Sequence, residues 1–517
     1  MRILRALPVL VLLAALAAFA REPGALAGFP LDDAWIFRVY ARALAHGEGF
    51  AYDGARQEAG ATSPLWVVAS APAERLAPLG SGAVVLGVKA IGALLALAAV
   101  LAAFAIAQSV SGSARVAALA ASLFALEPRV VFSALSGMEN ALLVALWTGA
   151  LAAWLARRHA LALGLWALLP VTRPEALVLL PIALLVWLDW VRRAGFRPAR
   201  LAWLAVALLP AIAWSLFCLH ATGHALPNTF YLKAQPFRLG ASELAVAWRA
   251  VGHHGLAPAW LGLAAAVAFA AWPWRARPPR AWTASLLLGP VAYLLAVAGS
   301  RHVAFSGYYW TRWLDPAGVL AMLPACIVVA SGVVALVERA RGARSGARAP
   351  AGEQAGGATL RLALPLAGLA ALGALASVPH SVEAWRVRRF HLGSDSRAID
   401  ALNVAAGRWI AAHTPEHAVV AVNDAGAIRY FGARRTLDLV RLNDADVAFG
   451  RISREAALLS ADWLAIFPGI FGPTPLAAPI ALRFAPRTSF QVSVEEYTVC
   501  PCPEQTELRI YERNTDR

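Results

Sequence analysis

The sequence predicts a polytopic α-helical membrane protein with an α/β domain after its last membrane span. Of its 517 residues 59% are hydrophobic and only 15% are charged, and the mean hydropathy is +0.59. A soluble chain of this length would need far more charged surface. Apolar runs suited to a bilayer recur up to residue 378, and beyond it the pattern changes to short strands and turns. These observations favour a helical bundle followed by a small folded domain.

The apolar runs give the membrane spans. A spanning helix needs roughly 17 to 25 mostly apolar residues, and about 11 runs reach or approach that length. The first run ends in Ala18-Phe19-Ala20, so a cleaved signal peptide is the alternative for this segment. In either case the loop that follows lies outside. The predicted spans are 6–20, 82–108, 113–127, 139–155, 160–172, 175–191, 201–220, 257–273, 282–299, 316–337 and 360–378.

The distribution of arginine predicts the orientation of the spans. The net charge of +15 comes mostly from arginine, since Lys89 and Lys233 are the only lysines. With the N-terminus in the cytoplasm, the short arginine-dense connections all fall on the cytoplasmic side, as the positive-inside rule requires. The basic charge is therefore explained by topology, and no nucleic-acid partner is predicted. The cytoplasmic connections are 157–158, 192–200, 275–280 and 339–361, and the outer segments are 21–81, 221–256, 300–315 and everything after 378.

The chain divides into a transmembrane domain, 1–379, and a C-terminal extracytoplasmic α/β domain, 380–517. In the second, HAVVAVNDAGAIRYFGARRTLDLV predicts a strand, an Asn-Asp turn, a short helix and another strand. The segments ADWLAIF, SFQVSVEEYTV and ELRIYER are further strand-like runs. The domain contains neither GxGxxG nor a P-loop, so no nucleotide site is predicted there.

Two adjacent acids, Asp32 and Asp33, stand at the start of a helical pattern in the outer loop 21–81. Asp33 is placed as the N-cap of a helix that runs to about His46, with Gly47 as its stop. An apolar stripe opposite Arg38 and Arg42 predicts that this helix lies flat at the outer membrane interface. Capping accounts for Asp33 but leaves Asp32 without a structural role.

The loop also resembles a known family. The string DDAWIFRVYARALAHGEGFAYDGARQEAGATSPLW is similar to the first outer loop of bacterial GT-C glycosyltransferases that use polyprenyl-phosphate sugars, in particular the terminal arabinofuranosyltransferase-like proteins. The resemblance continues, in order, in SGMEN (136–140), TRPEA (172–176), HALPNTFYLKA (224–234) and NDAGAIRYFGARRTLDLVRLND (423–444). The chain departs from the pattern at Val39, Ala43 and 59–61 while the Asp pair is intact, which puts the acceptor in doubt more than the reaction.

The resemblance implies a GT-C-like enzyme in the bacterial inner membrane. Its donor is a polyprenyl-phosphate sugar, a hexose or a pentose, and its acceptor is an envelope glycan or lipid on the outer face. Inverting transfer needs a carboxylate base for the attacking hydroxyl, and the family's outer-loop Asp maps to Asp32 or Asp33. We expect Asp32 to be the base because the cap already accounts for Asp33. The alternative use of the pair is to share a divalent cation, for which no third ligand is identifiable.

Cationic and aromatic side chains of the outer segments are the remaining site candidates. Guanidinium and ammonium groups suit the leaving phosphate. Arg173 has an alternative role in an ion pair with Glu139 or Glu175, and the aromatic run 305–313 is also typical of a membrane-interface belt. The phosphate candidates are Arg38, Arg173, Lys233 and Arg312, with Arg301 as a further outer cation; the substrate-binding candidates are Glu58, Tyr308 and Trp310.

Two other functional classes fit a polytopic bundle. One is a transporter or flippase for a lipid-linked or envelope substrate, and the other is a sensory or assembly protein. Transporters usually place polar sites near the bilayer midplane, on broken helices in repeated halves. Here the acids lie in an outer loop and the sequence shows no internal repeat, which favours the enzyme.

Overall fold

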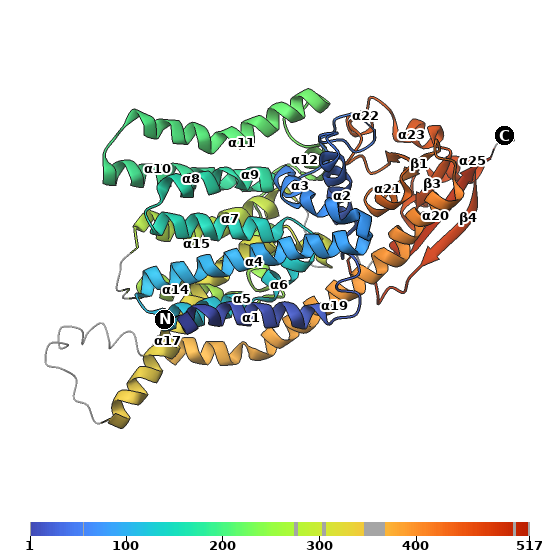
Figure 1. The fold of residues 1–517 in the computed structure, drawn as a ribbon. Helices are drawn as coiled ribbons and strands as arrows, with labels where there is room; N and C mark the ends of the chain where they lie inside the picture. Colours follow the sequence, from blue (N-terminus) through green and yellow to red (C-terminus); the bar gives the residue numbers. More distant parts are fainter. Residues whose placement is uncertain are drawn as a thin grey trace.

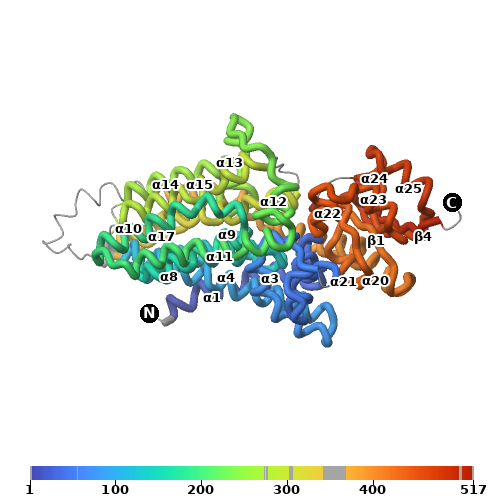
Figure 2. The backbone as a smooth tube through the Cα atoms, turned by 90° about the horizontal axis from the view of Figure 1, so that it is seen from above, coloured from blue at the N-terminus to red at the C-terminus, as the bar shows by residue number. Residues whose placement is uncertain are grey.

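The computed structural model describes residues 2–54, 56–272, 274, 278–301, 307–345, 368–499 and 503–514. Figure 1 shows long helices lying side by side, with the sheet of the C-terminal region at one end of the bundle. Seen from above, the C-terminal domain extends from that same end, with α21 and α22 nearest the junction (Figure 2).

The first half of the bundle contains long apolar helices and the outer loop. In the outer loop, Ser63 caps α3 through its side chain and Pro64 occupies the first turn, where no amide donor is needed. The elements are α1 Arg2–Ala20, α2 Asp32–Ala45, α3 Pro64–Ser70, η1 Ala71–Leu79, α4 Ser81–Ser111, α5 Ala114–Ala125, α6 Pro128–Leu135, α7 Asn140–Leu155, α8 His159–Ala167, α9 Leu169–Thr172, η2 Pro174–Leu179, α10 Leu180–Ala194 and α11 Pro198–Thr222.

The second half adds the remaining bundle helices and the helix that leads into the C-terminal domain. The elements are α12 Asn228–Lys233, α13 Ala241–Gly252, α14 Ala259–Ala271, α15 Arg280–Ser300, α16 Tyr308–Thr311, α17 Asp315–Ser345 and α19 Val378–Ile399. Residues 368–376 are also helical, whereas the start of the predicted run 360–378 lies outside the described residues.

The chain is a multi-pass membrane protein. Within the described residues six helices are long and apolar enough to cross a bilayer, or seven if the bent pair α5 and α6 forms one span. Three shorter apolar helices, Asn140–Leu155, His159–Thr172 and Ala259–Ala271, coincide with further predicted runs. Every predicted run up to residue 337 therefore overlaps a helix, but the strict length criterion gives fewer spans than the predicted 11 or so.

Both the N-terminus and the turn between α10 and α11 lie at the end of the bundle opposite the C-terminal domain (Figure 1). That turn is one of the arginine-dense connections predicted for the cytoplasmic side. The arrangement matches the predicted alternation, and the direction in which the bundle sits in the membrane stays a prediction.

The C-terminal domain is built on a five-stranded sheet of order β2-β1-β3-β5-β4. Strand β1 pairs in parallel with β2 and β3, while β5 runs antiparallel to β3 and β4. The strands are β1 Val419–Val422, β2 Arg435–Asp438, β3 Trp463–Ile466, β4 Phe484–Gln491 and β5 Glu507–Arg513. The helices are η4 Asp400–Val404, α20 Ala405–His413, α21 Ala427–Gly432, α22 Ala445–Ala448, α23 Arg454–Ser460, α24 Pro468–Phe471, α25 Ala477–Arg483 and η5 Pro503–Gln505.

The predicted strand, turn, helix and strand of 417–440 are confirmed as β1, α21 and β2. The predicted strand 489–499 is wrong in position, because β4 begins at Phe484 and ends at Gln491. Beyond that point the chain turns, with the amide of Glu496 bonded to the carbonyl of Ser493 at 3.2 Å. The alternation of apolar and polar residues continues through this bend, so the sequence pattern did not reveal where the strand ends.

The outer-loop helix α2 is packed between the bundle and the C-terminal domain, where it contacts η1, α3 and α21. The prediction of an interfacial helix with an exposed polar face is therefore wrong. Arg38 is fully buried, and its guanidinium bonds to Ser70 and to Glu74, the latter at 3.2 Å. The helix ends as predicted before Gly47, whose φ of 83° suits glycine.

Candidate functional site

The two acids of the outer loop occupy the first turn of α2. The N-cap position belongs to Leu31, and no side chain caps this helix, so the predicted N-cap role of Asp33 is wrong. Consecutive helical residues point about 100° apart, which sends the two neighbouring carboxylates in different directions. Each acid therefore has its own set of partners.

Asp32 faces the C-terminal domain. Its Oδ2 accepts the backbone N–H of Gly426 at 2.7 Å, and its Oδ1 accepts that of Ala427 at 2.8 Å. These amides open α21, so the acid of one domain satisfies donors of the other. Burial raises the pKa of Asp32 well above its usual range, Asp424 adds to the rise, and the two amides oppose it.

Asp33 faces the bundle and meets two cations. Its Oδ2 forms an ion pair with Arg312 and lies 3.5 Å from Nζ of Lys233. Burial raises the pKa of Asp33, but the charges of Lys233 and Arg312 outweigh it and leave the pKa below its usual value. The two cations therefore keep the Asp33 carboxylate ionised. The side chain is 22% exposed, so it remains reachable from solvent.

These groups line a small cavity where the bundle meets the outer loop. Its volume is about 30 Å³, which is room for roughly two or three water molecules. Each segment in which the sequence resembles the GT-C family contributes at least one lining residue. The cavity is lined by Asp33, Ile36, Phe37, Gly60, Ala61, Thr62, Met138, Glu139, Arg173, Thr229, Lys233, Arg301, Arg312, Trp313 and Leu442.

Two of the arginines that line the cavity have unused donors. Nε and Nη1 of both Arg301 and Arg312 are buried without a hydrogen-bond partner in the described part of the chain. The Arg312 guanidinium stacks 4.2 Å above the ring of Tyr309, and that of Arg301 lies 4.7 Å above Trp313. Buried N–H groups strongly favour a partner, and these cations provide a site for an anion.

Arg173 shows both of the ion pairs considered for it. It bonds to Glu139, and its Nη2 lies 3.3 Å from Oε1 of Glu175. Glu175 in turn pairs with Arg301 at 2.6 Å, so a chain of alternating charges runs behind the cavity. This chain holds Arg301 and Arg173 in place at the cavity wall.

Besides Asp32, four of the residues proposed from the sequence do not line the cavity. Arg38 is bound to Glu74 as described above. Glu58 lies 3.3 Å from Arg56, and burial raises its pKa to about 7. Tyr308 is buried against Phe132, with ring centroids 4.3 Å apart, and Trp310 packs edge-on against Tyr309 and Trp313.

Thr229 and Trp313 are among the lining residues that were not singled out in the sequence. Thr229 precedes Lys233 by four residues on α12, which places both on one helical face. Trp313 adjoins Arg312 in the aromatic run, where Tyr308 and Trp310 seemed the better platforms. Helical spacing around Lys233 would have identified Thr229; nothing in the sequence distinguished Trp313 from its neighbours.

Further buried acids surround Asp32 within the C-terminal domain. Burial raises the pKa of Asp424 to about 6, while a hydrogen bond from Asn403 at 2.8 Å opposes the rise. Asp395 accepts the amides of Thr498 and Val499 at 2.6 and 3.1 Å. In the described part of the chain no three His, Cys, Asp or Glu side chains are grouped so as to hold a metal ion. The divalent cation considered for the Asp pair has no ligand cluster there.

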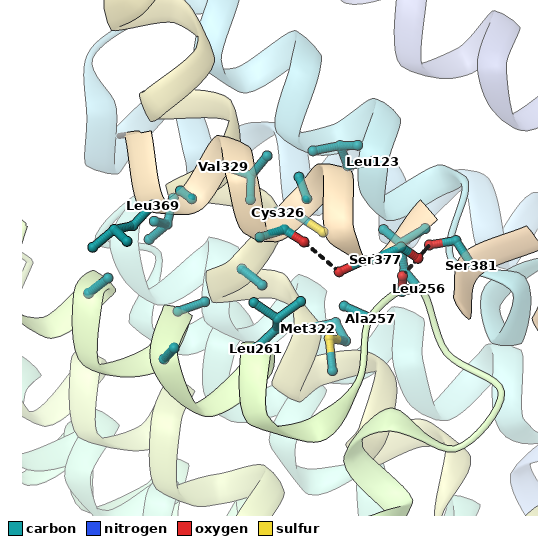
Figure 3. A pocket seen from close by; sticks show the side chains of 18 of the residues that line it. Leu123, Leu256, Ala257, Leu261, Met322, Cys326, Val329, Leu369, Ser377 and Ser381 are labelled. Atoms are coloured by element: carbon teal, nitrogen blue, oxygen red, sulfur yellow. Dashed lines mark hydrogen bonds between the residues drawn. The ribbon is translucent and has the colours of Figure 1, made fainter. Parts of the chain in front are cut away.

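A second cavity is of a different kind. Its volume is about 350 Å³, and it lies among α5, α14, α17, residues 369–374 and α19 (Figure 3). The lining is almost entirely aliphatic, and Ser377 and Ser381 use their hydroxyls on the backbone carbonyls of Gly373 and Leu256. None of the described residues that line it is Asp, Glu, His, Lys or Arg.

Comparison with known proteins identifies the fold class. The family described as "Domain of unknown function (DUF8728)" matches residues 394–498, and no curated protein matches the sequence. The structure resembles ArnT from Cupriavidus metallidurans bound to undecaprenyl phosphate, with a TM-score of 0.58 and 15% identity over 98% of this chain and 97% of that one. The apo form of ArnT gives 0.58 and 16% over the same shares. The chain therefore has the fold of GT-C membrane enzymes, as predicted.

Proposed function

We propose that this protein is a glycosyltransferase of the bacterial inner membrane that uses a polyprenyl-phosphate sugar. It transfers the sugar, with inversion, to an envelope glycan or lipid on the outer face. The observation that carries the proposal is the position of Asp33, a reachable carboxylate in a cavity lined by four cations, two of which have unused donors. The GT-C fold supports it, since ArnT, which is matched over nearly its whole length, was solved with undecaprenyl phosphate.

The cations supply the site for the donor phosphate. Arg301 and Arg312 present N–H groups to the cavity, and a guanidinium binds phosphate oxygens in bidentate fashion. Lys233 adds a compact charge on the side of Asp33. In this proposal Arg173 supports Arg301 through Glu175 rather than gripping the phosphate alone, and no metal ion is required.

Asp33, rather than Asp32, is the base of this proposal. Both oxygens of Asp32 are already occupied by backbone amides, whereas Asp33 is ionised and faces the cavity. The acceptor hydroxyl oxygen bonds to the anomeric carbon, and its proton passes to the Asp33 carboxylate. The bond between that carbon and the phosphate oxygen breaks, and the phosphate leaves with its electron pair to the arginines.

The test is a transfer assay with purified protein. The protein is incubated with a panel of polyprenyl-phosphate hexoses and pentoses and with envelope extract, and released polyprenyl phosphate is measured. The Asp33→Asn variant should lower the rate roughly 10²- to 10⁴-fold. The matched control is Asp53→Asn, in the same outer loop, whose carboxylate pairs with Arg429 at 3.3 Å and lies away from the cavity.

Full release of polyprenyl phosphate by Asp33→Asn would refute the assignment of the base. Movement of intact lipid-linked sugar across vesicles, without release of polyprenyl phosphate from any donor, would instead establish the transporter alternative.

A further inference from the structure

Two neighbouring residues of α2 connect two different parts of the molecule. Asp33 bonds to cations of the bundle, while Asp32 bonds to the first amides of α21 in the C-terminal domain. We infer that Asp32 is a positioning residue, a latch through which the C-terminal domain holds Asp33 in the cation cavity. The inference rests on the proposed function, because it deepens the account of the same site.

The Asp32 carboxylate packs closely against the residues that begin α21. A Cβ at Gly426 would lie 2.8 Å from Oδ2 of Asp32 and still nearer to its backbone oxygen. Real side chains do not tolerate such contacts, so only glycine lets the amide of residue 426 approach the carboxylate. Both oxygens of the carboxylate are used, which fixes its rotation as well as its position.

The rest of α21 binds the same outer loop. The guanidinium of Arg42 donates to the carbonyl of Tyr430 at 2.7 Å, and the hydroxyl of Tyr52 donates to the carbonyl of Ala425 at 2.7 Å. The Trp35 ring packs against Tyr430 with centroids 5.0 Å apart. The docked face is therefore extensive, and Asp32 is the member of it that adjoins the base.

The C-terminal domain also contacts the segment that carries Arg312. The amide of Tyr309 donates to the carbonyl of Val499 at 3.3 Å, and the Tyr309 ring underlies Arg312. Asp395 fixes Val499 by accepting its amide. One domain thus holds the acid through Asp32 and a phosphate-binding arginine through Tyr309, so its docking sets the distance between them.

The latch is tested with two variants that disturb it from either side. Asp32→Asn replaces one of the two accepting oxygens by an NH₂ group that faces an N–H donor, and Gly426→Ala introduces the clashing Cβ without altering either acid. Both should lower kcat roughly 10- to 100-fold, because a displacement near 1 Å is enough for such a loss. The donor KM should stay within about twofold, since the arginines are unchanged. The control Tyr52→Phe removes a neighbouring interdomain hydrogen bond and should keep kcat.

A double mutant separates positioning from general stability. If Asp32 acts through Asp33, the Asp32→Asn/Asp33→Asn protein should be no slower than Asp33→Asn alone. Multiplying losses, or an equal loss of kcat in Tyr52→Phe, would overturn the latch. Full activity of both Asp32→Asn and Gly426→Ala beside an inactive Asp33→Asn would also overturn it and leave the proposed function standing. An active Asp33→Asn would instead refute the proposed base.

Discussion

Arg312 uses only part of its guanidinium. Nη2 pairs with Asp33, while Nε and Nη1 face the cavity region without a partner in the described chain. The residue therefore has two tasks in the proposed mechanism, which are to keep Asp33 ionised and to receive the phosphate. Lysine would preserve the charge but lose the fork of donors.

For this reason Arg312→Lys and Arg301→Lys should each raise the donor KM roughly 10- to 100-fold, which corresponds to the loss of one or two charge-assisted hydrogen bonds. Steady-state kinetics with a donor that works for the wild type measures the effect. Arg238→Lys is the control, because Arg238 is an exposed outer arginine paired with Glu243. Unchanged donor KM in both variants would remove these arginines from the phosphate site.

The buried Asp395 carboxyl leads to a prediction about how stability depends on pH. Burial raises the pKa of its carboxyl to about 8 from an ordinary 3.8, although the hydrogen bonds from Thr498 and Val499 oppose the rise. The folded protein therefore binds this proton more tightly than the unfolded chain does. The resulting stabilisation is complete below the unfolded pKa of 3.8 and is lost as the pH rises through about 8.

The wild-type Tm should fall as the pH rises from 3.8 to about 8 and level off above that, and Asp395→Asn, which resembles the protonated acid, should reduce that fall. Thermal unfolding in detergent at a series of pH values measures it. Glu496→Gln, exposed on the adjacent segment, should follow the wild type. The same slope in Asp395→Asn as in the wild type would show that this carboxyl does not titrate in that range.

At this scale the sequence singled out the two acids but did not predict the partners of either one. Asp32 and Asp33 were both singled out, and a cap was the best local explanation for Asp33. The partners that decide between them, Gly426 and Lys233, come from distant parts of the chain, and no local pattern encodes such contacts.

The helix α2 depends on a buried ion pair. Arg38 and Glu74 are almost completely removed from solvent, and Glu74 also accepts the hydroxyl of Tyr430 at 2.9 Å. Removing one member of such a pair leaves an uncompensated buried charge, which costs about 3 to 5 kcal/mol.

Arg38→Met should therefore lower the Tm strongly while the donor KM stays unchanged in the remaining folded protein. Arg56→Met provides the comparison, since the half-exposed Arg56 pairs with Asp446 on the surface and such pairs are worth about 0 to 1 kcal/mol. A raised donor KM in Arg38→Met without a loss of stability would return Arg38 to the phosphate site.

The elements that the sequence predicted well were those with long apolar runs or a regular spacing of apolar residues. Long apolar runs became helices, and the alternation in 417–440 became β1, α21 and β2. The start of helix α2 was predicted within two residues and its end within one, but its surroundings were missed. An amphipathic stripe looks the same whether a membrane surface or a second domain covers the other face, so burial of Arg38 could not be read from it.

The whole molecule has its sheet domain at one end and its N-terminus at the other (Figure 1). We predict that the sheet domain is outside the cell membrane. In a variant with Cys500 and Cys502 replaced by Ser, cysteines placed at the exposed positions Glu455 and Arg487 should react with an impermeant maleimide in intact spheroplasts. A cysteine at the exposed Arg192, in the last turn of α10, should react only after lysis. The reverse pattern would invert the proposed topology.

The latch joins parts of the chain that are made at very different times. Asp32 and its first amide partner are separated by 394 residues, which take about 20 to 80 s to synthesise at roughly 5 to 20 residues per second. In the proposed topology the outer loop has by then crossed the membrane, while the domain that binds Asp32 has not yet been translated. A nascent chain, or one truncated before α21, contains the cations but not the amides that hold Asp32. If the proposed latch holds, activity begins only after the C-terminal domain has been synthesised and has reached the outer face.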